Sequence, residues 1–437
     1  MFYLKKQKNN ILYGHHDRYW IPFNNPEIMS FYLNHLFVPH SRKELFKSSI
    51  TRIIPFMSCK SMLHKTYLAS NNDENKVTDI KAKLTYYESQ LLEMMNLVGL
   101  TDLLEERLRQ INFSFSGPFK LLVLEDYQHL SRSQKVFFLF DRASPVPCAV
   151  AKVNNNAKEN SFLKSEYCAL TSLQGQLGIK LNKMIPVPLV FFEDKELTVL
   201  IQTFLPGRSI YFDLRNSLFP KRHAQAHFRL ALDWLIKFQL ATKIKDLYID
   251  EEFFKEHVIF QLEKYLECFD TSKHETEMIK NKISEEHKLI GERIPIVARQ
   301  GDFWARNIII NGSYVGVVDW EQCLERSTPF YDLFMFPVSY GLSHPWRLAR
   351  WENPVDAFRA TFLHKKWLSQ LVRIYFQSYC HSIGISNKLL EIFFFVFLIE
   401  RALEEKNRID NYIIRTDAIT WRKLVSEYSQ LGGSICF

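Results

Sequence analysis

Between residues 118 and 204, short apolar runs alternate with polar turns. The apolar runs are typical of β-strands, and they lie at 120–124, 135–139, 148–153, 188–192 and 197–204. Between the third and fourth runs, apolar residues recur at helical spacing and predict a helix over 161–173. The order of three strands, a helix and two strands predicts a small α+β unit.

From residue 221 onward the apolar residues recur mainly at helical spacing. The predicted helices lie at 224–243, 255–268, 356–383, 388–408 and 419–429. One stretch, 294–320, interrupts them with a pattern of loop and strand. An irregular segment inside a helical region is a frequent location for binding and catalytic residues.

The first 110 residues resemble neither region, although 79–110 has helical spacing. We therefore expect three parts: an accessory region over 1–110, a sheet-based part over 111–204 and a helical part over 205–437.

The charge is concentrated at one end of the chain. Lys and Arg number 56 against 48 Asp and Glu, and residues 1–70 contribute ten basic and three acidic residues. The remainder is almost neutral, which argues against a nucleic-acid-binding protein. The basic N-terminal region is suited to an acidic partner or membrane surface, although a solvated basic face is the simpler interpretation.

Cysteine usage and apolar run length bear on the location of the protein. The seven cysteines form no Cys-x-x-Cys pair, which fits reduced thiols in a cytoplasmic protein. No apolar run of 18 residues lacks a charge, so no transmembrane segment is expected.

Residues 300–321 contain the clearest candidate chemistry. Two β-branched runs, 308–310 and 315–318, flank Asn311-Gly312, which is a strong signal for a β-hairpin.

The hairpin brings polar residues together at its open end. Asn307 precedes the first strand and Asp319 follows the second, so the two should lie side by side. Amide and carboxylate oxygens suit Mg²⁺, and Asp302, on the loop entering the hairpin, can face the same place. An Asp, an Asn five residues later, a hairpin and a second Asp form the arrangement that kinases use for phosphate transfer.

In detail, residues 300–307 and 316–321 resemble the aminoglycoside phosphotransferase and choline kinase family, whose pattern is roughly HGD-x4-N followed by (I/V)DWE. Residues 329–333, Pro-Phe-Tyr-Asp-Leu, resemble the P-x-x-DL element of that family. The resemblance implies a bilobal, protein-kinase-like α+β fold with ATP between a small sheet lobe and a larger helical lobe. It also implies an ATP- and Mg²⁺-dependent kinase that phosphorylates a hydroxyl of a small molecule such as a sugar, an amino alcohol or an aminoglycoside.

The resemblance assigns roles to residues of the helical part. Asp302 would orient the acceptor hydroxyl and take its proton, Asn307 and Asp319 would hold Mg²⁺, and Asp332 would support the catalytic core. The family has a His where this chain has Gln300, whose amide can still donate and accept hydrogen bonds. We expect that amide to bond a backbone group of the catalytic loop or of the Asp319 segment.

The resemblance also assigns roles in the small lobe. The strand 148–153 looks like the V-x-K strand of kinases, so Lys152 would bind the α and β phosphates and Glu166, 14 residues later, would hold Lys152. The segment with Gln202 and Phe204 would meet the adenine through backbone groups.

The loop over 125–133, which should cover the phosphates, contains no glycine. Ser131 and Arg132 could contact phosphates there, although an ordinary polar hairpin loop is an equal interpretation. Together with Gln300, this loop motivates the alternative of a catalytically impaired pseudokinase that acts as a nucleotide- or partner-binding module. A protein kinase is disfavoured because Trp-Glu, and not Phe-Gly, follows Asp319.

Two further groups of charged residues have simpler explanations. Glu400 and Glu404 are one helical turn apart, but Arg401 and Lys406 nearby favour a solvated helix face. His15 and His16 are metal-binding residue types, but adjacent residues point apart and no further ligands follow at site spacing.

Overall fold

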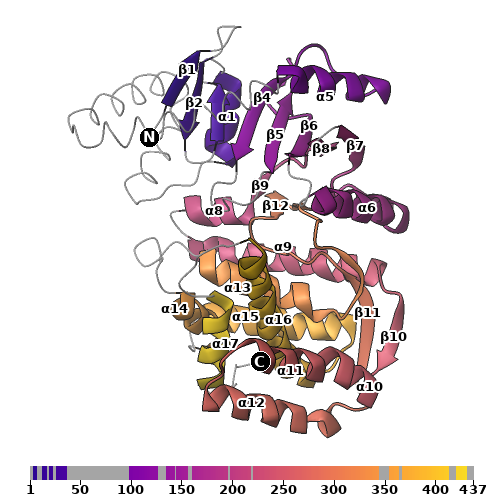
Figure 1. The fold of residues 1–437 in the computed structure, drawn as a ribbon, viewed down its shortest axis with the longest axis vertical. Coiled ribbons are helices and arrows are strands. Elements are labelled where there is room, and N and C mark those ends of the chain that lie inside the picture. The colour runs from indigo at the N-terminus through magenta and orange to yellow at the C-terminus, as the bar shows by residue number, and fades with distance from the viewer. Residues whose placement is uncertain are drawn as a thin grey trace, which may run out of the picture. The chain divides into compact units, whose positions relative to one another are not determined.

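The computed structural model describes most of the chain from residue 98 onward and short segments before it. The described residues are 3–6, 12–16, 19–22, 26–36, 98–125, 134–142, 144–155, 160–194, 197–217, 220–343, 354–363, 367–412 and 420–430. Two compact units are distinguished, one comprising Met1–Tyr167 and Pro186–Pro206 and the other Cys168–Ile185 and Gly207–Phe437. Each is described by itself below (Figure 1).

The first unit is built on one antiparallel sheet. Its strands follow in the order β1 (Tyr3–Lys6), β2 (Leu12–His16), β3 (Tyr19–Pro22), β4 (Lys120–Glu125), β5 (Lys135–Phe140), β6 (Ala149–Asn154), β8 (Leu197–Thr203) and β7 (Pro188–Asp194). Strands β4 to β8 are the five predicted from the sequence, and α6 (Asn160–Gln176) contains the predicted helix. The predicted α+β fold, a sheet-based part followed by a mainly helical part, is confirmed.

The sheet is wider than predicted because the N-terminal segment adds to it. In β3, Tyr19 lies opposite Leu124 of β4, and Trp20 lies opposite Val123. Strands β1 to β3, which belong to the expected accessory region over 1–110, therefore extend the sheet of the first unit.

Two helices pack on the sheet through alternate residues of its strands. Helix α5 (Val98–Gln110) shares a hydrophobic cluster with Val123 and Leu139, and α1 (Pro26–His35) shares another with Leu122 and Phe140. Successive residues of a strand point to opposite faces, so the two helices cover opposite faces. Residues 37–97, with much of the helical pattern over 79–110, lie outside the described residues.

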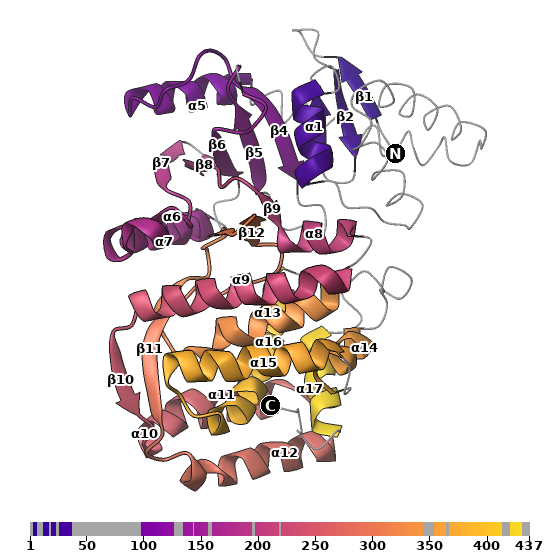
Figure 2. The same cartoon turned by 180° about the vertical axis from the view of Figure 1, so that it is seen from behind.

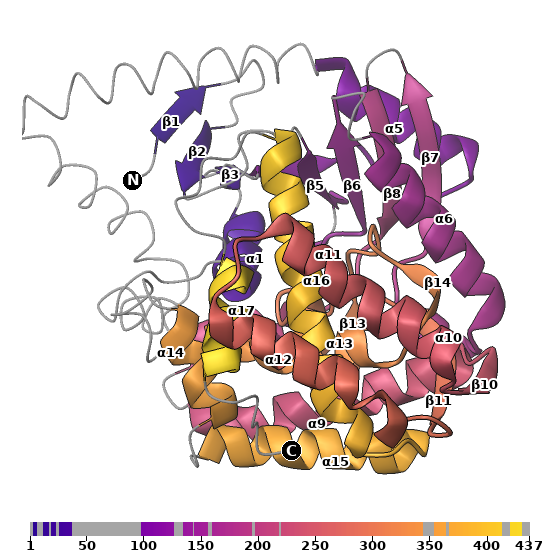
Figure 3. The same cartoon turned by 60° about the horizontal axis from the view of Figure 1, so that its bottom comes forward.

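The second unit is mainly helical. Its helices are α7 (Ile179–Asn182), α8 (Ile210–Asn216), α9 (Pro220–Ala241), α10 (Glu251–Phe254), α11 (Phe260–Cys268), α12 (Lys273–Ser284), α13 (Phe330–Ser343), α14 (Pro354–Phe358), α15 (Trp367–Ile383), α16 (Lys388–Tyr412) and α17 (Thr420–Gln430). Helix α17 lies against both α12 and α16 (Figure 3). Every residue of α13 except Leu342 is buried, which makes this helix the centre of the unit.

Two small sheets frame the segment that carries the candidate chemistry. One contains β10 (Lys245–Tyr248), β11 (Arg293–Arg299) and β14 (Leu324–Ser327), and the other contains β13 (Tyr314–Val317), β12 (Ile308–Asn311) and β9 (Arg208–Ser209). Strand β9 runs beside β12, with Ser209 opposite Ile309, immediately before α8 (Figure 2). The loop between β11 and β12 is therefore fixed at both ends by strand pairing.

The helices differ from the predicted ones in two respects. The helix predicted over 356–383 is divided into α14, a π-helical turn over Arg359–Leu363, and α15. Five helices were not predicted, namely α7, α8, α10, α12 and α13. Because α13 is buried on nearly all sides, its residues show no apolar stripe, and it also contains Pro337.

None of the described helices has, on its own, the length and apolar character needed to cross a membrane. The segments Trp367–Ile383 and Lys388–Asn407 satisfy that test only when taken together, and the angle between them is 113°.

Candidate active site

The loop over 300–307 is attached to the first turn of α13. The carboxylate of Asp332 accepts hydrogen bonds from the backbone N–H groups of Gln300 at 2.6 Å and Gly301 at 2.9 Å. Asp332 is fully buried. Burial raises the pKa of its carboxyl group, and the two backbone donors and nearby Arg299 offset only part of this effect.

Gln300 is also fully buried, and its side chain is hydrogen-bonded both to the loop over 300–307 and to the segment that contains Asp319. Its amide nitrogen donates to the backbone carbonyls of Val318 at 3.2 Å and Asp319 at 2.5 Å. Its amide oxygen accepts from the backbone N–H of Asp302 at 2.8 Å. The hydrogen bond that we expected between this amide and the Asp319 segment is therefore present, and a second one reaches the loop itself.

Gly301 occupies a position that only glycine fits. Its φ is +89°, in the left-handed region. A Cβ atom there would lie 2.2 Å from the backbone oxygen of Gln322. The loop therefore passes directly against the segment that follows Asp319.

Asp302 and Asn307 are joined by their side chains. The amide nitrogen of Asn307 donates to Oδ2 of Asp302 at 2.8 Å and to the backbone oxygen of Asp302 at 2.9 Å. Because the nitrogen of Asn307 is used in this way, oxygen Oδ1 is the atom of this side chain that can serve a cation.

The middle of the loop is held by two helices. Ser339 of α13 accepts a hydrogen bond from the backbone N–H of Ala305 at 3.1 Å, and Tyr211 of α8 donates its backbone N–H to the carbonyl of Ala305 at 2.8 Å. The guanidinium of Arg306 lies 4.6 Å from the ring centroid of Tyr211. The position of Asp302 therefore depends on α8 as well as on α13.

The predicted hairpin is present, with its turn shifted by one residue. Asn311 pairs with Tyr314, so Gly312 and Ser313 form the turn, and Gly312 has a φ of +61°. This φ matches the first position of a type II′ turn, which glycine favours.

At the open end of the hairpin, the strands place Asp319 beside the loop. The backbone N–H of Val318 donates to the carbonyl of Asn307 at 3.0 Å, so Asp319 is the next residue after the last pair. Asp319 itself has a φ of +67°, which is uncommon outside glycine and is often found at functional sites. Trp320 is fully buried and donates its indole N–H to the carbonyl of Val317 at 2.9 Å, which holds this bend in place.

In the first unit, Lys152 and Glu166 form a buried ion pair. The ammonium of Lys152 lies 2.8 Å and 2.6 Å from the two carboxylate oxygens of Glu166. The side chains are 8% and 0% exposed, respectively. Glu166 lies on the buried side of α6 with Leu163 and Leu170, whereas Phe162 is only half-buried.

The remaining small-lobe candidates lie at the end of β8 or outside the described residues. Gln202 is buried, and its side-chain oxygen has no hydrogen-bond partner among the described residues. Phe204 packs against Phe31 of α1 with a ring-centroid distance of 5.7 Å. Ser131 and Arg132 lie outside the described residues.

A charged cluster close to Asp302 was not predicted. Arg401 donates to Glu404 at 2.6 Å and to the hydroxyl of Tyr331 at 2.9 Å, and Arg299 lies 4.0 Å from the centroid of the Tyr331 ring. Burial lowers the pKa of Arg401, but the hydroxyl of Tyr331 and the carboxylates of Glu404 and Asp302 outweigh it and raise the pKa overall.

Glu400 belongs to the same cluster. Its burial raises the pKa of its carboxyl group to about 7, although Arg299 and Arg401 oppose the shift. Both glutamates are half-buried, so they do not lie on a fully solvated helix face. The spacing of Glu400 and Glu404 in the sequence predicted that both lie on one side of a helix. The residues that partly cover that side are Arg299 of β11 and Tyr331 of α13.

Comparisons with known proteins give solved structures only. No protein-family model matches the chain, and no curated protein matches it significantly. Aminoglycoside phosphotransferase APH(4)-Ia is 13% identical, with 75% of this chain and 99% of that chain covered and a TM-score of 0.45.

Two further similar structures are a choline/ethanolamine kinase family protein from Mesorhizobium loti and spectinomycin phosphotransferase APH(9)-Ia in complex with ADP and spectinomycin. The first is 10% identical, with 73% of this chain and 88% of that chain covered and a TM-score of 0.42. The second is 10% identical, with 75% and 93% covered and a TM-score of 0.40. Because all three TM-scores are below 0.5, these likenesses support no conclusion about the fold or the activity of this protein.

Proposed function

We propose that this protein is a kinase of the aminoglycoside phosphotransferase and choline kinase type, which transfers the γ-phosphate of ATP to a hydroxyl group of a small molecule. The observation that supports this most directly is the hydrogen-bonded pair of Asp302 and Asn307, with Asp319 next to Asn307 at the end of the hairpin. Gln300 ties the two segments together.

The donor atoms fit the two groups that such a reaction requires. Asn307 offers an amide oxygen and Asp319 a carboxylate, the hard oxygen ligands that Mg²⁺ takes. Lys152 offers a cation for phosphate oxygens, held in a fixed position by Glu166. Mg²⁺, when bound by these residues, would neutralise negative charge on the phosphates of ATP.

The side chains of the loop have separate tasks in this proposal. Asp302 accepts a hydrogen bond from the acceptor hydroxyl, orients it and takes its proton as the hydroxyl attacks. Asn307 fixes the Asp302 carboxylate through its amide nitrogen. Gln300, Gly301 and Asp332 hold the backbone of the loop so that the carboxylate needs no rearrangement before reaction.

The test is a search for a phosphorylated product. Purified protein is incubated with ATP, Mg²⁺ and a panel of sugars, amino alcohols and aminoglycosides, and mass spectrometry detects any compound that gains one phosphate. Asp302→Asn and Asp319→Asn should each abolish the product. Asp233→Asn, which neutralises an exposed acid on α9 with no described ion pair, is the matched control and should retain activity. Turnover that survives both active-site changes would refute the proposal.

The alternative is a pseudokinase, and the glycine-free segment over 125–133 is what supports it. A thermal-shift titration separates the two functions, because a bound ligand stabilises the folded state by an amount that grows with the ratio of ligand concentration to Kd. Stabilisation by ATP and Mg²⁺ with no product from any acceptor would favour the binding module. A phosphorylated product that depends on Asp302 would exclude it.

A further inference from the structure

Three metal-binding side chains meet where α8 approaches α9. Asp213 projects from α8, and His223 and His227 lie four residues apart on α9. Residues at this spacing occupy the same face of a helix. This group takes no part in the proposed phosphate transfer and was not recognised in the sequence, because Asp213 and the two histidines belong to different helices.

The distances within the group are short enough for metal ligands, and without an ion Nε2 of His227 is hydrogen-bonded to Asp213. Oδ2 of Asp213 lies 3.0 Å from Nε2 of His227 and 3.1 Å from Nδ1 of His223. All three ligand atoms lie within 4.8 Å of one another. In a tetrahedral zinc site with bonds of about 2.0 Å, neighbouring ligand atoms are roughly 3.3 Å apart. Small adjustments of the side chains would therefore place all three around one ion.

The second nitrogen of His227 provides independent support. His227 is 2% exposed, and its Nδ1 lies 3.2 Å from the hydroxyl of Tyr340, which is fully buried on α13. A histidine that binds a metal through one ring nitrogen usually donates the other N–H to an oxygen, which fixes the ring and its tautomer. Tyr340 is placed to accept that hydrogen bond, so Nε2 would present its lone pair toward Asp213.

We propose that Asp213, His223 and His227 form a binding site for a borderline divalent transition-metal ion, for which Zn²⁺ is the best match. Two imidazoles and one carboxylate favour Zn²⁺ over Mg²⁺ and Ca²⁺, which prefer oxygen ligands. The side chain of His223 is 47% exposed, so a fourth position is open to water. Arg208 places a positive charge near Asp213. With three protein ligands and this charge, the affinity should be below that of four-ligand structural sites.

An ion at this position would clamp α8 to α9. Tyr211, two residues before Asp213, donates its backbone N–H to Ala305 in the loop over 300–307. The clamp would therefore stabilise the helix that anchors this loop. The site itself is complete without any nucleotide, so the proposal does not depend on the proposed function.

The experiment measures metal binding directly on the full chain without an affinity tag. Protein stripped with a chelator is titrated with Zn²⁺ by calorimetry and with Co²⁺ by visible absorption, which reports tetrahedral coordination. We expect one equivalent to bind, to resist millimolar Mg²⁺, and to raise Tm by about 2–5 °C.

Three variants identify the ligands. His223→Ala removes a half-exposed ligand with little risk to folding and should lower the affinity at least tenfold and abolish the Co²⁺ spectrum. The metal affinity and the Co²⁺ spectrum should not change in His274→Ala, which replaces an exposed histidine on α12. They should likewise not change in the double variant His15→Ala with His16→Ala. No saturable binding by the original protein, or equal binding by His223→Ala, overturns the proposal, because the three side chains would then be only a hydrogen-bonded cluster.

Discussion

The side-chain amide of Gln300 donates a hydrogen bond to the backbone carbonyl of Asp319, with a nitrogen–oxygen distance of 2.5 Å. The same side chain accepts the backbone N–H of Asp302 through its oxygen. One buried residue therefore sets the separation between the loop that carries Asp302 and the strand end that carries Asp319. A histidine can make one of these bonds with each ring nitrogen, which explains how glutamine and histidine can serve the same position.

Gln300→Ala should lower the free energy of unfolding by about 2 kcal/mol. Each lost hydrogen bond removes on the order of 1 kcal/mol, and the buried partners left behind add to the loss. Gln300→His should recover most of this stability and keep or raise any phosphotransfer activity. Urea denaturation measures both variants. If the Ala variant is as stable as the original protein, the hydrogen bonds of the Gln300 side chain make no net contribution to the free energy of unfolding.

Gly301→Ala should be strongly destabilising, by roughly 3 kcal/mol or more. The added Cβ meets the Gln322 backbone at 2.2 Å, and the backbone there has a φ of +89°. Gly291→Ala is a matched control, because Gly291 has a φ of +85° but nothing within 4 Å of a new Cβ. The control should show only the cost of the backbone conformation, about 1 kcal/mol. Equal losses in the two variants would contradict the close contact.

Glu400 should make the protein less stable as the pH rises from about 4.5 to about 7. Its pKa is raised from 4.5 to about 7 by burial in the folded protein. Between these values the folded state binds more protons than the unfolded state, so stability falls with increasing pH, and the full loss is present above pH 7.

Glu400→Gln should therefore stabilise the protein above pH 7, on the order of 2 kcal/mol, and have no such effect below pH 4.5. Urea denaturation at several pH values measures this difference. Glu277→Gln, at an exposed position on α12, is the control and should show little pH dependence. A constant difference between the Glu400 variant and the original protein across this range would refute the prediction.

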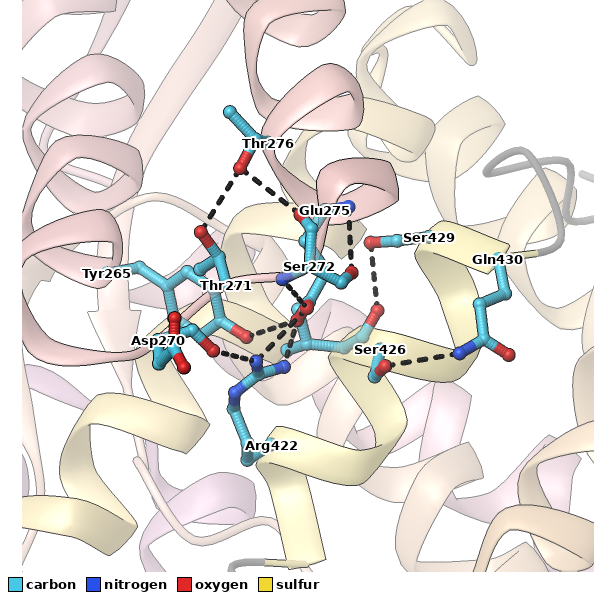
Figure 4. A network of polar contacts seen from close by, with 11 residues as sticks. Tyr265, Asp270, Thr271, Ser272, Glu275, Thr276, Arg422, Ser426, Ser429 and Gln430 are labelled. Carbon is cyan, nitrogen blue, oxygen red and sulfur yellow. Dashed lines mark hydrogen bonds and ion pairs between the residues drawn. The ribbon is translucent and has the colours of Figure 1, made fainter.

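Arg422→Met should destabilise the protein by about 3 kcal/mol. Glu275 is almost fully buried, and its carboxylate accepts hydrogen bonds from Arg422, Tyr265 and the backbone of Ser272 (Figure 4). Burial tends to raise the pKa of Glu275, but Arg422 and Ser272 outweigh it and lower the pKa, so the carboxylate is charged. Removing its cation leaves an uncompensated buried charge, which is costly.

The control for this change lies on α12, the helix that carries Glu275. Lys273 is 87% exposed and lies 3.8 Å from Glu277, so Lys273→Met should cost less than about 0.5 kcal/mol. Calorimetric unfolding compares the two variants. Similar losses would show that the joint between α12 and α17 does not depend on Arg422.

Local patterns in the sequence were enough to predict strands β4 to β8 and helix α6, but not β1 to β3 or α1. The strands from Lys120 to Thr203 are short, rich in β-forming residues and separated by turns, and each appears where predicted. The hairpin of β12 and β13 was likewise predictable, because the Asn311-Gly312 sequence between two apolar runs signals a turn, although the turn itself is formed by Gly312 and Ser313.

What could not be predicted depends on residues far apart in the sequence. Helix α13 has no polar side to reveal it, because it is covered from all directions. Glu404 was interpreted as solvated because its neighbours in sequence are charged, whereas Tyr331, 73 residues away, bonds its carboxylate. The group formed by Asp213, His223 and His227 was not predicted for the same reason, because its members come together only through the packing of α8 on α9.

The hydrogen bonds between Asp332 and the loop over 300–307 affect how the protein unfolds on heating. The amide groups of Gln300 and Gly301 are bonded to the first turn of the most deeply buried helix, so the loop cannot open locally without disturbing that helix. Their amide protons should therefore exchange with solvent as slowly as those of α13 itself. A heated sample should then contain only fully folded, active molecules and globally unfolded ones. The phosphotransfer activity should therefore fall in proportion to the fraction of folded protein.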